Sequence, residues 1–367
     1  MKVSLVTLHR VFNYGSVLQA YATQKIFEDA GCEAEIVDYI TEQRTAKRIL
    51  LGKKGFFGLK NAKNIIRLPL RTISFLIKKR TFGKFLNRNC NLTKRKYVKA
   101  EDIITAPPQA DIYITGSDQV WNSQYNEGID KGFFLEYAPN DKKCIAFVSS
   151  FGKKALDESE KEVTKQYLKK YSAISVREDS ASDILEDMGY ASECLIDPTL
   201  QIDQADWKKI ASPRLIKEKY LILMLLYNED NGATEYARKI ADEKGLKLVK
   251  ISWELKKHKK VDKLMTHRTP EDFLSLFANA DFVVTNSFHG LAFSINFNRN
   301  FVVVPRKEFN SRIESLLRLT RLESRLAFSE NDAVEASKSS IDYTDINNIL
   351  DEERKRAKAF IEKSIKQ

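Results

Sequence analysis

Residues 279–294 read Asn279-Ala-Asp-Phe-Val-Val-Thr-Asn-Ser-Phe-His-Gly-Leu-Ala-Phe-Ser294. A short apolar run, Phe282–Val284, ends in small polar residues, and His289 and Gly290 then begin the next apolar pattern. This order is typical of a buried parallel strand that leads into a helix. His289 is one of only four histidines, and it follows a strand where α/β folds place their chemistry. The alternative is a histidine that only makes hydrogen bonds near a helix start.

The same alternation of strands and helices runs through both halves of the chain. A length of 367 residues is too great for one ordinary core and favours two domains. We therefore predict two Rossmann-like, doubly wound α/β domains that face each other across a cleft. The predicted parts are residues 1–200, residues 201–330 and a C-terminal helical tail, 331–367.

Composition excludes several classes of protein. No apolar run approaches the roughly 20 residues that span a bilayer, and the N-terminus reads as a strand rather than a signal peptide. The cysteines stand far apart, without metal-binding spacing, so we predict no metal site and a reducing cytoplasmic location. The four are Cys32, Cys90, Cys144 and Cys194.

The positive charge is concentrated in residues 44–99, an insertion in the first predicted domain. This segment contains 18 Lys and Arg and no Asp or Glu, so against a net charge of +11 the remainder carries −7. Apolar residues, Phe75, Phe82 and Phe85 among them, are interleaved with the cations. The pattern predicts a peripheral contact with an anionic membrane, on the inner leaflet. Ordinary surface helices are the alternative, and no motif indicates a nucleic-acid partner.

Two polar segments follow predicted strands in the first half. Asn13-Tyr14-Gly15-Ser16 is predicted as a turn, with Ser16 capping a helix over 17–30. Backbone N–H groups at that helix start could hold an anion or a sugar hydroxyl. The alternative is a turn with a capping serine and no ligand.

The second segment is Gly116-Ser-Asp-Gln-Val-Trp-Asn122. Asp118, Gln119 and Asn122 are candidates for binding sugar hydroxyls, and Trp121 for stacking on a sugar ring. The alternative is a loop whose polar side chains satisfy their own backbone.

Arginines supply candidate anion contacts. Arg177 stands at the end of a predicted strand, 173–176, where a guanidinium could clamp a carboxylate or phosphate. A salt bridge to Glu178 or Asp179 is the alternative. Arg306 is the second candidate cation. The sequence contains no nucleophile elbow, P-loop or zinc cluster.

Taken together, these segments resemble the polysaccharide pyruvyl transferase family. The resemblance covers roughly residues 1–305 and implies a GT-B-like fold. It also implies transfer of a pyruvyl group from phosphoenolpyruvate to sugar hydroxyls, with ketal formation. The segments that carry it, in the family's order, are Asn13-Tyr14-Gly15-Ser16, Leu18-Gln19-Ala20-Tyr21, Gly116–Asn122, Ser150-Phe151-Gly152, Ser175-Val176-Arg177-Glu178, Asp197-Pro198-Thr199 and Ser287-Phe288-His289-Gly290.

The resemblance also assigns roles. His289 and Arg177 would contact phosphoenolpyruvate, with Ser287 and Gly290 beside them, and Asp118 would face the cleft with the Asn13–Ser16 turn. Some members carry an arginine two residues before the histidine. This chain has Ser287 there, and we expect Arg306 to supply the missing cation.

The resulting hypothesis makes His289 the proton donor or phosphate partner, Arg177 the anion clamp and Asp118 the sugar-hydroxyl base or anchor. Phosphoenolpyruvate is a co-substrate, and no further cofactor is expected. The acceptor is a sugar of a surface polysaccharide or a lipid-linked oligosaccharide. Two alternatives stay open: a GT-B nucleotide-sugar glycosyltransferase, and a non-enzymatic protein that binds membranes or polyanions through 44–99.

Overall fold

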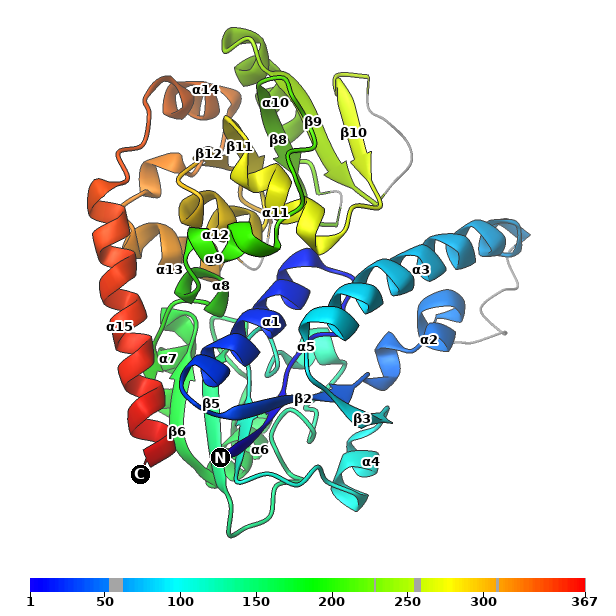
Figure 1. Ribbon diagram of the computed structural model, residues 1–367, viewed down its shortest axis with the longest axis vertical. Coiled ribbons are helices and arrows are strands. Elements are labelled where there is room, and N and C mark those ends of the chain that lie inside the picture. The colour runs from blue at the N-terminus through cyan, green and yellow to red at the C-terminus, as the bar shows by residue number, and fades with distance from the viewer. Residues whose placement is uncertain (53–61, 228, 254–258, 308–309, 367) are drawn as a thin grey trace. The chain divides into compact units, whose positions relative to one another are not determined.

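The computed structural model describes residues 1–52, 62–227, 229–253, 259–307 and 310–366, with no account of the side chains of 62–67. The chain forms two compact units (Figure 1). Unit 1 comprises Met1–Pro198 and Ala357–Gln367, and unit 2 comprises Thr199–Arg356. The predicted tail is therefore not a separate part. Its residues 331–356 belong to unit 2, and its last residues pack into unit 1.

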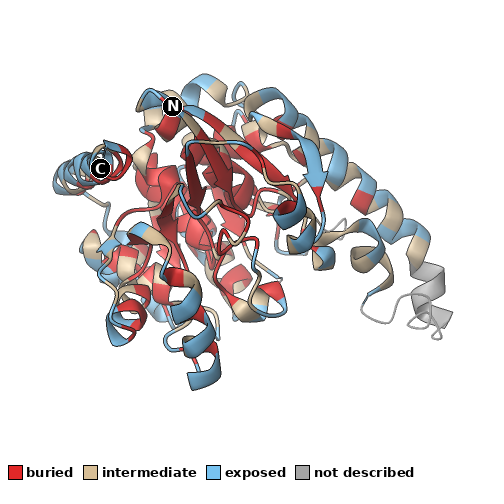
Figure 2. Cartoon of the chain, turned by 90° about the horizontal axis from the view of Figure 1, so that it is seen from below, coloured by how far each residue is buried: buried red, intermediate tan, exposed pale blue. Residues whose placement is uncertain are grey.

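Unit 1 is built on a parallel sheet of seven strands in the order β3-β2-β1-β4-β5-β6-β7. Its central strands β1, β4 and β5 are buried, as Figure 2 shows, because helices lie along the sheet, whereas the edge strands β3 and β7 are partly exposed. The strands are β1 (Lys2–Val6), β2 (Glu33–Tyr39), β3 (Leu92–Tyr97), β4 (Ile112–Thr115), β5 (Lys143–Ser149), β6 (Tyr171–Val176) and β7 (Glu193–Cys194). The helices are α1 (Tyr14–Asp29), α2 (Ala46–Leu51), α3 (Ala62–Asn89), α4 (Ala100–Thr105), α5 (Ser123–Asn126), α6 (Glu158–Leu168) and α7 (Asp179–Asp187), with the short 3-10 turn η1 (Glu42–Arg44).

Unit 2 has a parallel sheet of five strands in the order β10-β9-β8-β11-β12. The strands are β8 (Tyr220–Met224), β9 (Lys247–Ser252), β10 (Lys263–Thr266), β11 (Phe282–Thr285) and β12 (Asn300–Val303). The helices from residue 198 onward are α8 (Pro198–Gln201), α9 (Gln204–Ile210), α10 (Ala233–Glu243), α11 (Pro270–Ala278), α12 (Phe288–Asn296), α13 (Ser311–Leu319), α14 (Glu330–Lys338) and α15 (Thr344–Lys366), with the 3-10 turn η3 (Glu323–Arg325).

The predicted fold class is confirmed: each unit is an α/β structure with a parallel sheet, and the chain ends in a long helix. The predicted strand before His289 is β11, which is buried throughout. Helix α11 begins as its sequence indicates, with Thr269 as the N-cap, Pro270 in the first turn and a capping box that Asp272 completes. The described helices include none long and apolar enough to cross a membrane.

Helix α1 begins earlier than predicted, and the proposed cap was wrong. Asn13 is the N-cap, and its side-chain oxygen accepts a hydrogen bond from the Gly15 N–H at 2.9 Å. Ser16 instead lies in the first turn of the helix. Asparagine and serine are about equally good caps, so the sequence alone did not separate them.

The end of α15 completes the core of unit 1. Phe360 stacks near Phe147 of β5, with ring centroids 6.3 Å apart, and Ile361 is buried in the same cluster. This packing places the last turns of the chain against the first sheet.

Candidate active site

Each sheet has a point at which the chain reverses its direction of winding. In unit 1 this point lies between the neighbouring strands β1 and β4, and in unit 2 between β8 and β11. Ligands of open α/β sheets bind beyond the carboxyl ends of the strands at such points. The predicted site residues follow these strands or strands one or two places away in the same sheet, so each unit carries one set of them.

Asp118 is the centre of the unit 1 set. It follows β4 and has a φ of 74°, a left-handed conformation that is uncommon outside glycine and costs energy. Its carboxylate accepts hydrogen bonds from Ser16 Oγ at 2.7 Å and from the Gln119 N–H at 2.9 Å. The carboxylate is nearly buried. Asp118 is therefore held firmly from two sides, one of them the first turn of α1.

Arg177, after β6, joins Asp118 to a second carboxylate. Its guanidinium lies 2.8 Å from Asp197 and 3.2 Å from Asp118, and its side chain is completely buried. Burial alone would lower the pKa of Arg177, but the carboxylates around it outweigh burial and raise the pKa. The predicted direct contact of Arg177 with a substrate anion does not fit this burial. Its guanidinium instead contacts the carboxylates of Asp118 and Asp197.

Glu178 completes the buried cluster. Its carboxylate accepts hydrogen bonds from Ser150 Oγ at 2.7 Å and from the Gly152 N–H at 3.0 Å, and it lies 3.9 Å from Arg177. Gly152 has a φ of 61°, and a Cβ there would come within 1.9 Å of Gln119 Nε2, so another residue at this position would be strained and would have to displace Gln119. We call Asp118, Arg177, Glu178 and Asp197 the unit 1 carboxylate–arginine cluster.

A β-bulge near the end of β5 brings Ser149 and Ser150 to this cluster. The pairing of β5 with β6 shifts register between Ala146 and Ser149, and Val148 has a φ of 53°, which is a strong outlier for a β-branched residue. Bulges of this kind re-aim side chains beside active sites. Here Ser149 Oγ donates to the Thr115 carbonyl at 3.1 Å and ties β5 to β4.

Trp121 does not present a face for a sugar ring. It is 2% exposed, and it stacks on Phe134 with ring centroids 5.5 Å apart and an interplanar angle of 10°. Asn122 is the N-cap of α5 and accepts from the Tyr125 N–H. Of the predicted sugar-binding residues, Trp121 and Asn122 thus have structural roles. The loop polarity indicated a site, but it did not reveal that the aromatic ring belongs to the core.

A second charged group lies at the carboxyl ends of β1 and β2. Asp38 accepts hydrogen bonds from Arg10 Nε and Nη2, both at 2.7 Å, and His9 Nε2 lies 3.3 Å from the same carboxylate. Burial alone would raise the pKa of Asp38, but its hydrogen bonds to His9 and Arg10 outweigh burial and lower the pKa well below its usual range. None of these three residues is among the predicted site residues: His9 and Arg10 directly follow β1, which is a local signal for this strand end, whereas Asp38 lies inside β2 and gives no such signal.

In unit 2, His289 lies in the first turn of α12 and is nearly buried. Ser287 is the N-cap, and its Oγ accepts from the Gly290 N–H at 3.3 Å. Gly290 packs so closely on β11 that a Cβ would come within 2.4 Å of Thr285 Oγ1. The absence of a side chain at Gly290 therefore lets α12 begin directly at the strand end, which places His289 beside N–H groups that favour anions.

Arg306 lies after β12, and its contacts differ from those of Arg177. Its Nε donates to Glu229 Oε2 at 2.7 Å, and its guanidinium lies 5.0 Å from the ring of Tyr227, which is 68% exposed. Arg312 of α13 lies 5.7 Å from the ring of Phe288, the neighbour of His289. The described part of unit 2 therefore offers two cations after β12, Arg306 in the loop and Arg312 in the first turn of α13.

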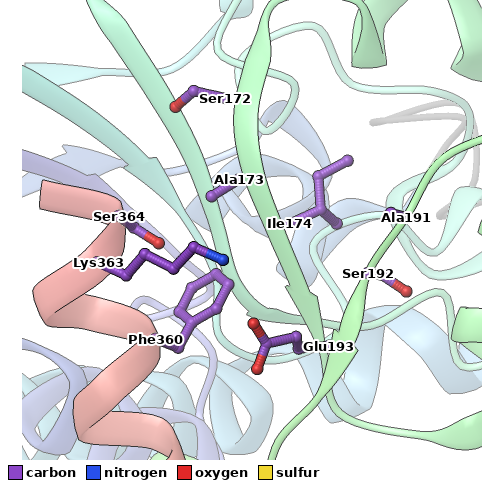
Figure 3. Close-up of a pocket in the computed structure, with 9 residues that line it drawn as sticks. All are labelled: Ser172, Ala173, Ile174, Ala191, Ser192, Glu193, Phe360, Lys363 and Ser364. Carbon is purple, nitrogen blue, oxygen red and sulfur yellow. The ribbon is translucent and has the colours of Figure 1, made fainter. Parts of the chain in front are cut away.

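The described residues also include a cavity of about 200 Å³ in unit 1 (Figure 3). It lies beside the first half of β6, away from the carboxyl ends of the strands, and is excluded as the candidate site on that ground. Its lining includes Ser172, Ile174, Ser192, Glu193, Phe360 and Lys363. Among the described residues, no group of three or more His, Cys, Asp or Glu could hold a metal ion.

Comparisons with known proteins place the chain in context. A family model described as polysaccharide pyruvyl transferase matches residues 13–308. No curated protein matches the chain. UDP-GlcNAc 2-epimerase from Neisseria meningitidis, bound to UDP-GlcNAc, is similar in structure, with a TM-score of 0.56, 9% identity and coverage of 100% of this chain and 99% of that one.

A structure of MnaA from S. aureus with UDP has a TM-score of 0.51 and 12% identity, and the match covers 95% of this chain and 89% of that one. Identities this low show the fold alone, which is GT-B-like.

Proposed function

The chain belongs to the polysaccharide pyruvyl transferase family, and on this premise we propose that it transfers a pyruvyl group from phosphoenolpyruvate to hydroxyls of a sugar acceptor, with ketal formation. The product belongs to the synthesis of a surface polysaccharide or a lipid-linked oligosaccharide. The reaction takes place in the cytoplasm, and it uses phosphoenolpyruvate as co-substrate without a further cofactor.

One observation carries the proposal: His289 stands at the start of α12, at the winding reversal of unit 2. Phosphoenolpyruvate bears a phosphate and a carboxylate, and the N-terminus of a nine-residue helix favours such anions. Ser287 and Gly290 belong to this helix start, and Arg306 or Arg312 adds a cation. We therefore assign the donor to unit 2.

The chemistry needs balanced proton transfers. C3 of phosphoenolpyruvate gains a proton, C2 becomes electrophilic, and a sugar hydroxyl bonds to C2 as it loses its own proton. A second hydroxyl then bonds to C2 and loses its proton, while the C2–O bond to phosphate breaks. Of the two protons released by the hydroxyls, one replaces the proton given to C3 and the other leaves with phosphate. Histidine titrates near neutral pH, so His289 suits the protonation of C3 or of the leaving phosphate.

We assign the acceptor to unit 1. Asp118 is the proposed anchor or base for a sugar hydroxyl, because it has a carboxylate at the end of β4 that Ser16 and Arg177 fix in place. Gln119 and the Asn13–Ser16 start of α1 are the neighbouring candidates for hydroxyl contacts. Arg177 acts through Asp118 as a positioning residue.

Ligand protection separates this proposal from nucleotide-sugar transfer. We expect phosphoenolpyruvate to raise the thermal midpoint of the protein, because a ligand that binds only the folded state stabilises it. UDP-GlcNAc at the same concentration should leave the midpoint unchanged. Protection by UDP-GlcNAc alone would favour a nucleotide-sugar glycosyltransferase instead.

Turnover tests the role of His289. Phosphate release from phosphoenolpyruvate, measured across a panel of lipid-linked and nitrophenyl sugars, should identify an acceptor. His289→Ala should then lower kcat by about 10²–10⁴-fold without a change in thermal midpoint. His267→Ala, a matched histidine after β10, should have near-normal turnover. Near-normal turnover of His289→Ala would contradict the assignment.

A further inference from the structure

Helix α3 has two unlike faces. One face packs against unit 1, where Phe75 and Phe82 contact Phe12, with ring centroids 5.4 and 6.0 Å away. Phe85 and Leu86 are buried on the same side. These four residues belonged to the apolar pattern predicted to face a membrane, and that expectation was wrong for them. Of the rest of that pattern, residues 53–61 lie outside the described residues.

The outward face of α3 carries a separate apolar group. Leu70 is 68% exposed, and Ile73 and Leu76 are each 55% exposed. Their spacing of three residues places them on neighbouring positions of one helix face. Among the described residues, nine large apolar side chains are exposed, and these three fall within seven residues. Such clustering marks an interaction surface more often than scattered exposure does.

Cations continue the same face. Arg80 and Lys84 follow Leu76 at intervals of four residues, and Lys79 is beside them, all three exposed. No acidic residue occurs anywhere in 44–99, and among the described residues none of these three cations forms an ion pair of the kind found on other helices. On α9, α14 and α15, exposed lysines pair with acids three residues away, as Lys209–Asp206, Lys338–Glu335 and Lys355–Glu352. The outward surface of α3 is therefore uncompensated in charge.

We propose that the outward surface formed by Leu70, Ile73, Leu76, Lys79, Arg80 and Lys84 docks on an anionic lipid bilayer. A bilayer surface complements both of its parts, because headgroup phosphates attract the cations and the acyl boundary accepts the apolar side chains. Nucleic acid would match the cations but leave the apolar side chains in water. The helix lies along the surface and does not span it.

This inference goes beyond the proposed function and does not depend on the chemistry at His289. It favours an acceptor that is itself anchored in the membrane, since docking would hold the enzyme at the surface where lipid-linked sugars are found. Sedimentation with vesicles measures the docking, and phosphate release with a water-soluble acceptor measures the chemistry. The two can therefore fail independently.

The test compares vesicles of phosphatidylcholine with vesicles that also contain phosphatidylglycerol. The full chain should bind the anionic vesicles and not the neutral ones. Replacing Lys79, Arg80 and Lys84 by Gln should weaken binding by about fivefold per charge. Replacing Leu70, Ile73 and Leu76 by Gln should remove the binding that persists in high salt, because salt screens only the electrostatic part. Glutamine preserves helix propensity in both variants.

Matched substitutions elsewhere serve as controls. Gln at Lys209, Lys338 and Lys355 removes three exposed charges, and Val163→Gln removes an exposed apolar side chain of unit 1. Both controls should bind as the unaltered chain does. Equal binding to both vesicle types, or loss of binding in the controls as well, would overturn the proposal. So would apolar variants that bind normally while single-stranded nucleic acid displaces the protein from vesicles.

Discussion

The two arginines of the candidate site differ in what holds them. Arg177 of unit 1 is fully buried and lies within 3.2 Å of two carboxylates. Arg306 of unit 2 is partly exposed, with one short ion pair to Glu229 and an exposed tyrosine beneath it. Buried charges of this kind are fixed by their partners, whereas an exposed pair can exchange its partner for a ligand at little cost.

This contrast indicates different roles for Arg177 and Arg306, which the sequence analysis treated alike as candidate anion contacts. The unit 1 carboxylate–arginine cluster maintains the geometry of Asp118, which suits the orientation of a neutral sugar hydroxyl. The loop after β12 in unit 2 keeps Arg306 within reach of solvent, which suits the capture of a small anion. Substitutions in the unit 1 carboxylate–arginine cluster should therefore mainly lower the stability of the fold. Substitutions in the unit 2 site should mainly weaken binding of the donor.

The largest effect is expected at Arg177. Arg177→Met should destabilise unit 1 by about 3–5 kcal/mol, because it leaves several carboxylates buried without their cation. Arg306→Met should cost less than about 1 kcal/mol of stability and should raise the KM for phosphoenolpyruvate. Hydrogen exchange resolved by unit, with urea unfolding, measures the stability difference.

Arg177→Lys provides a second variant in case the methionine protein does not fold. Lysine retains the positive charge but cannot contact two carboxylates as the planar guanidinium does. The variant should therefore fold, because the buried carboxylates keep a cation, and it should have a lower kcat. A methionine variant at Arg177 as stable as the one at Arg306 would remove the contrast between the regions.

Lowering the pH should reduce the stability contributed by Asp38 in unit 1 more than that contributed by Glu229 in unit 2. The pKa of Asp38 is lowered on folding, so the unfolded chain binds the proton more readily and stability rises with pH. The contribution of Asp38 is complete above the ordinary aspartate pKa of about 4 and is lost as pH falls below it, on the order of 2 kcal/mol. The stability difference between the unaltered chain and Asp38→Asn should thus be greatest near pH 7 and shrink toward pH 2.

Glu229 supplies the comparison for this titration. Its pKa is also lowered, chiefly by its hydrogen bond from Arg306, but it is partly exposed and solvent screens the pair. Glu229→Gln should change the acid titration of stability only slightly. A larger acid effect at Glu229 than at Asp38 would reverse the expected order.

The smallest effects concern two serines at helix starts. Ser16→Ala removes a donor to the Asp118 carboxylate and should cost about 1.5 kcal/mol of stability. Ser287→Ala removes the N-cap of α12 and should cost about 1 kcal/mol. The discriminating measurement is kinetic: Ser16→Ala should raise the KM for the sugar, and Ser287→Ala that for phosphoenolpyruvate. Identical kinetic changes would argue against separate substrate sides.

The strand ends could be predicted because their cause is local. Phe282–Val284 is apolar and His289 follows at once, so the position of the histidine beyond β11 is written in consecutive residues. The same holds for Thr269 and Asp272, whose capping box depends on a spacing of three. Local patterns of this kind also located Asp118 and Arg177 at strand ends.

The partners of these residues could not be predicted, because they come from distant parts of the chain. Arg177 meets Asp118 across 59 residues, and Ser16 meets it across 102. Trp121 was misassigned for the same reason, since Phe134 and Phe151 surround it only after folding. Which face of α3 is buried likewise depends on Phe12, outside the helix.

The last turns of α15 have a consequence for the order of events at the ribosome. Unit 1 draws part of its core from Phe360, Ile361 and Ile365, so the first 198 residues emerge without side chains that their sheet needs. Domains usually fold as they are synthesised, the first one first. Here the residues of unit 2, Thr199–Arg356, are made before Ala357–Gln367, so the first sheet lacks part of its apolar cover until that segment emerges.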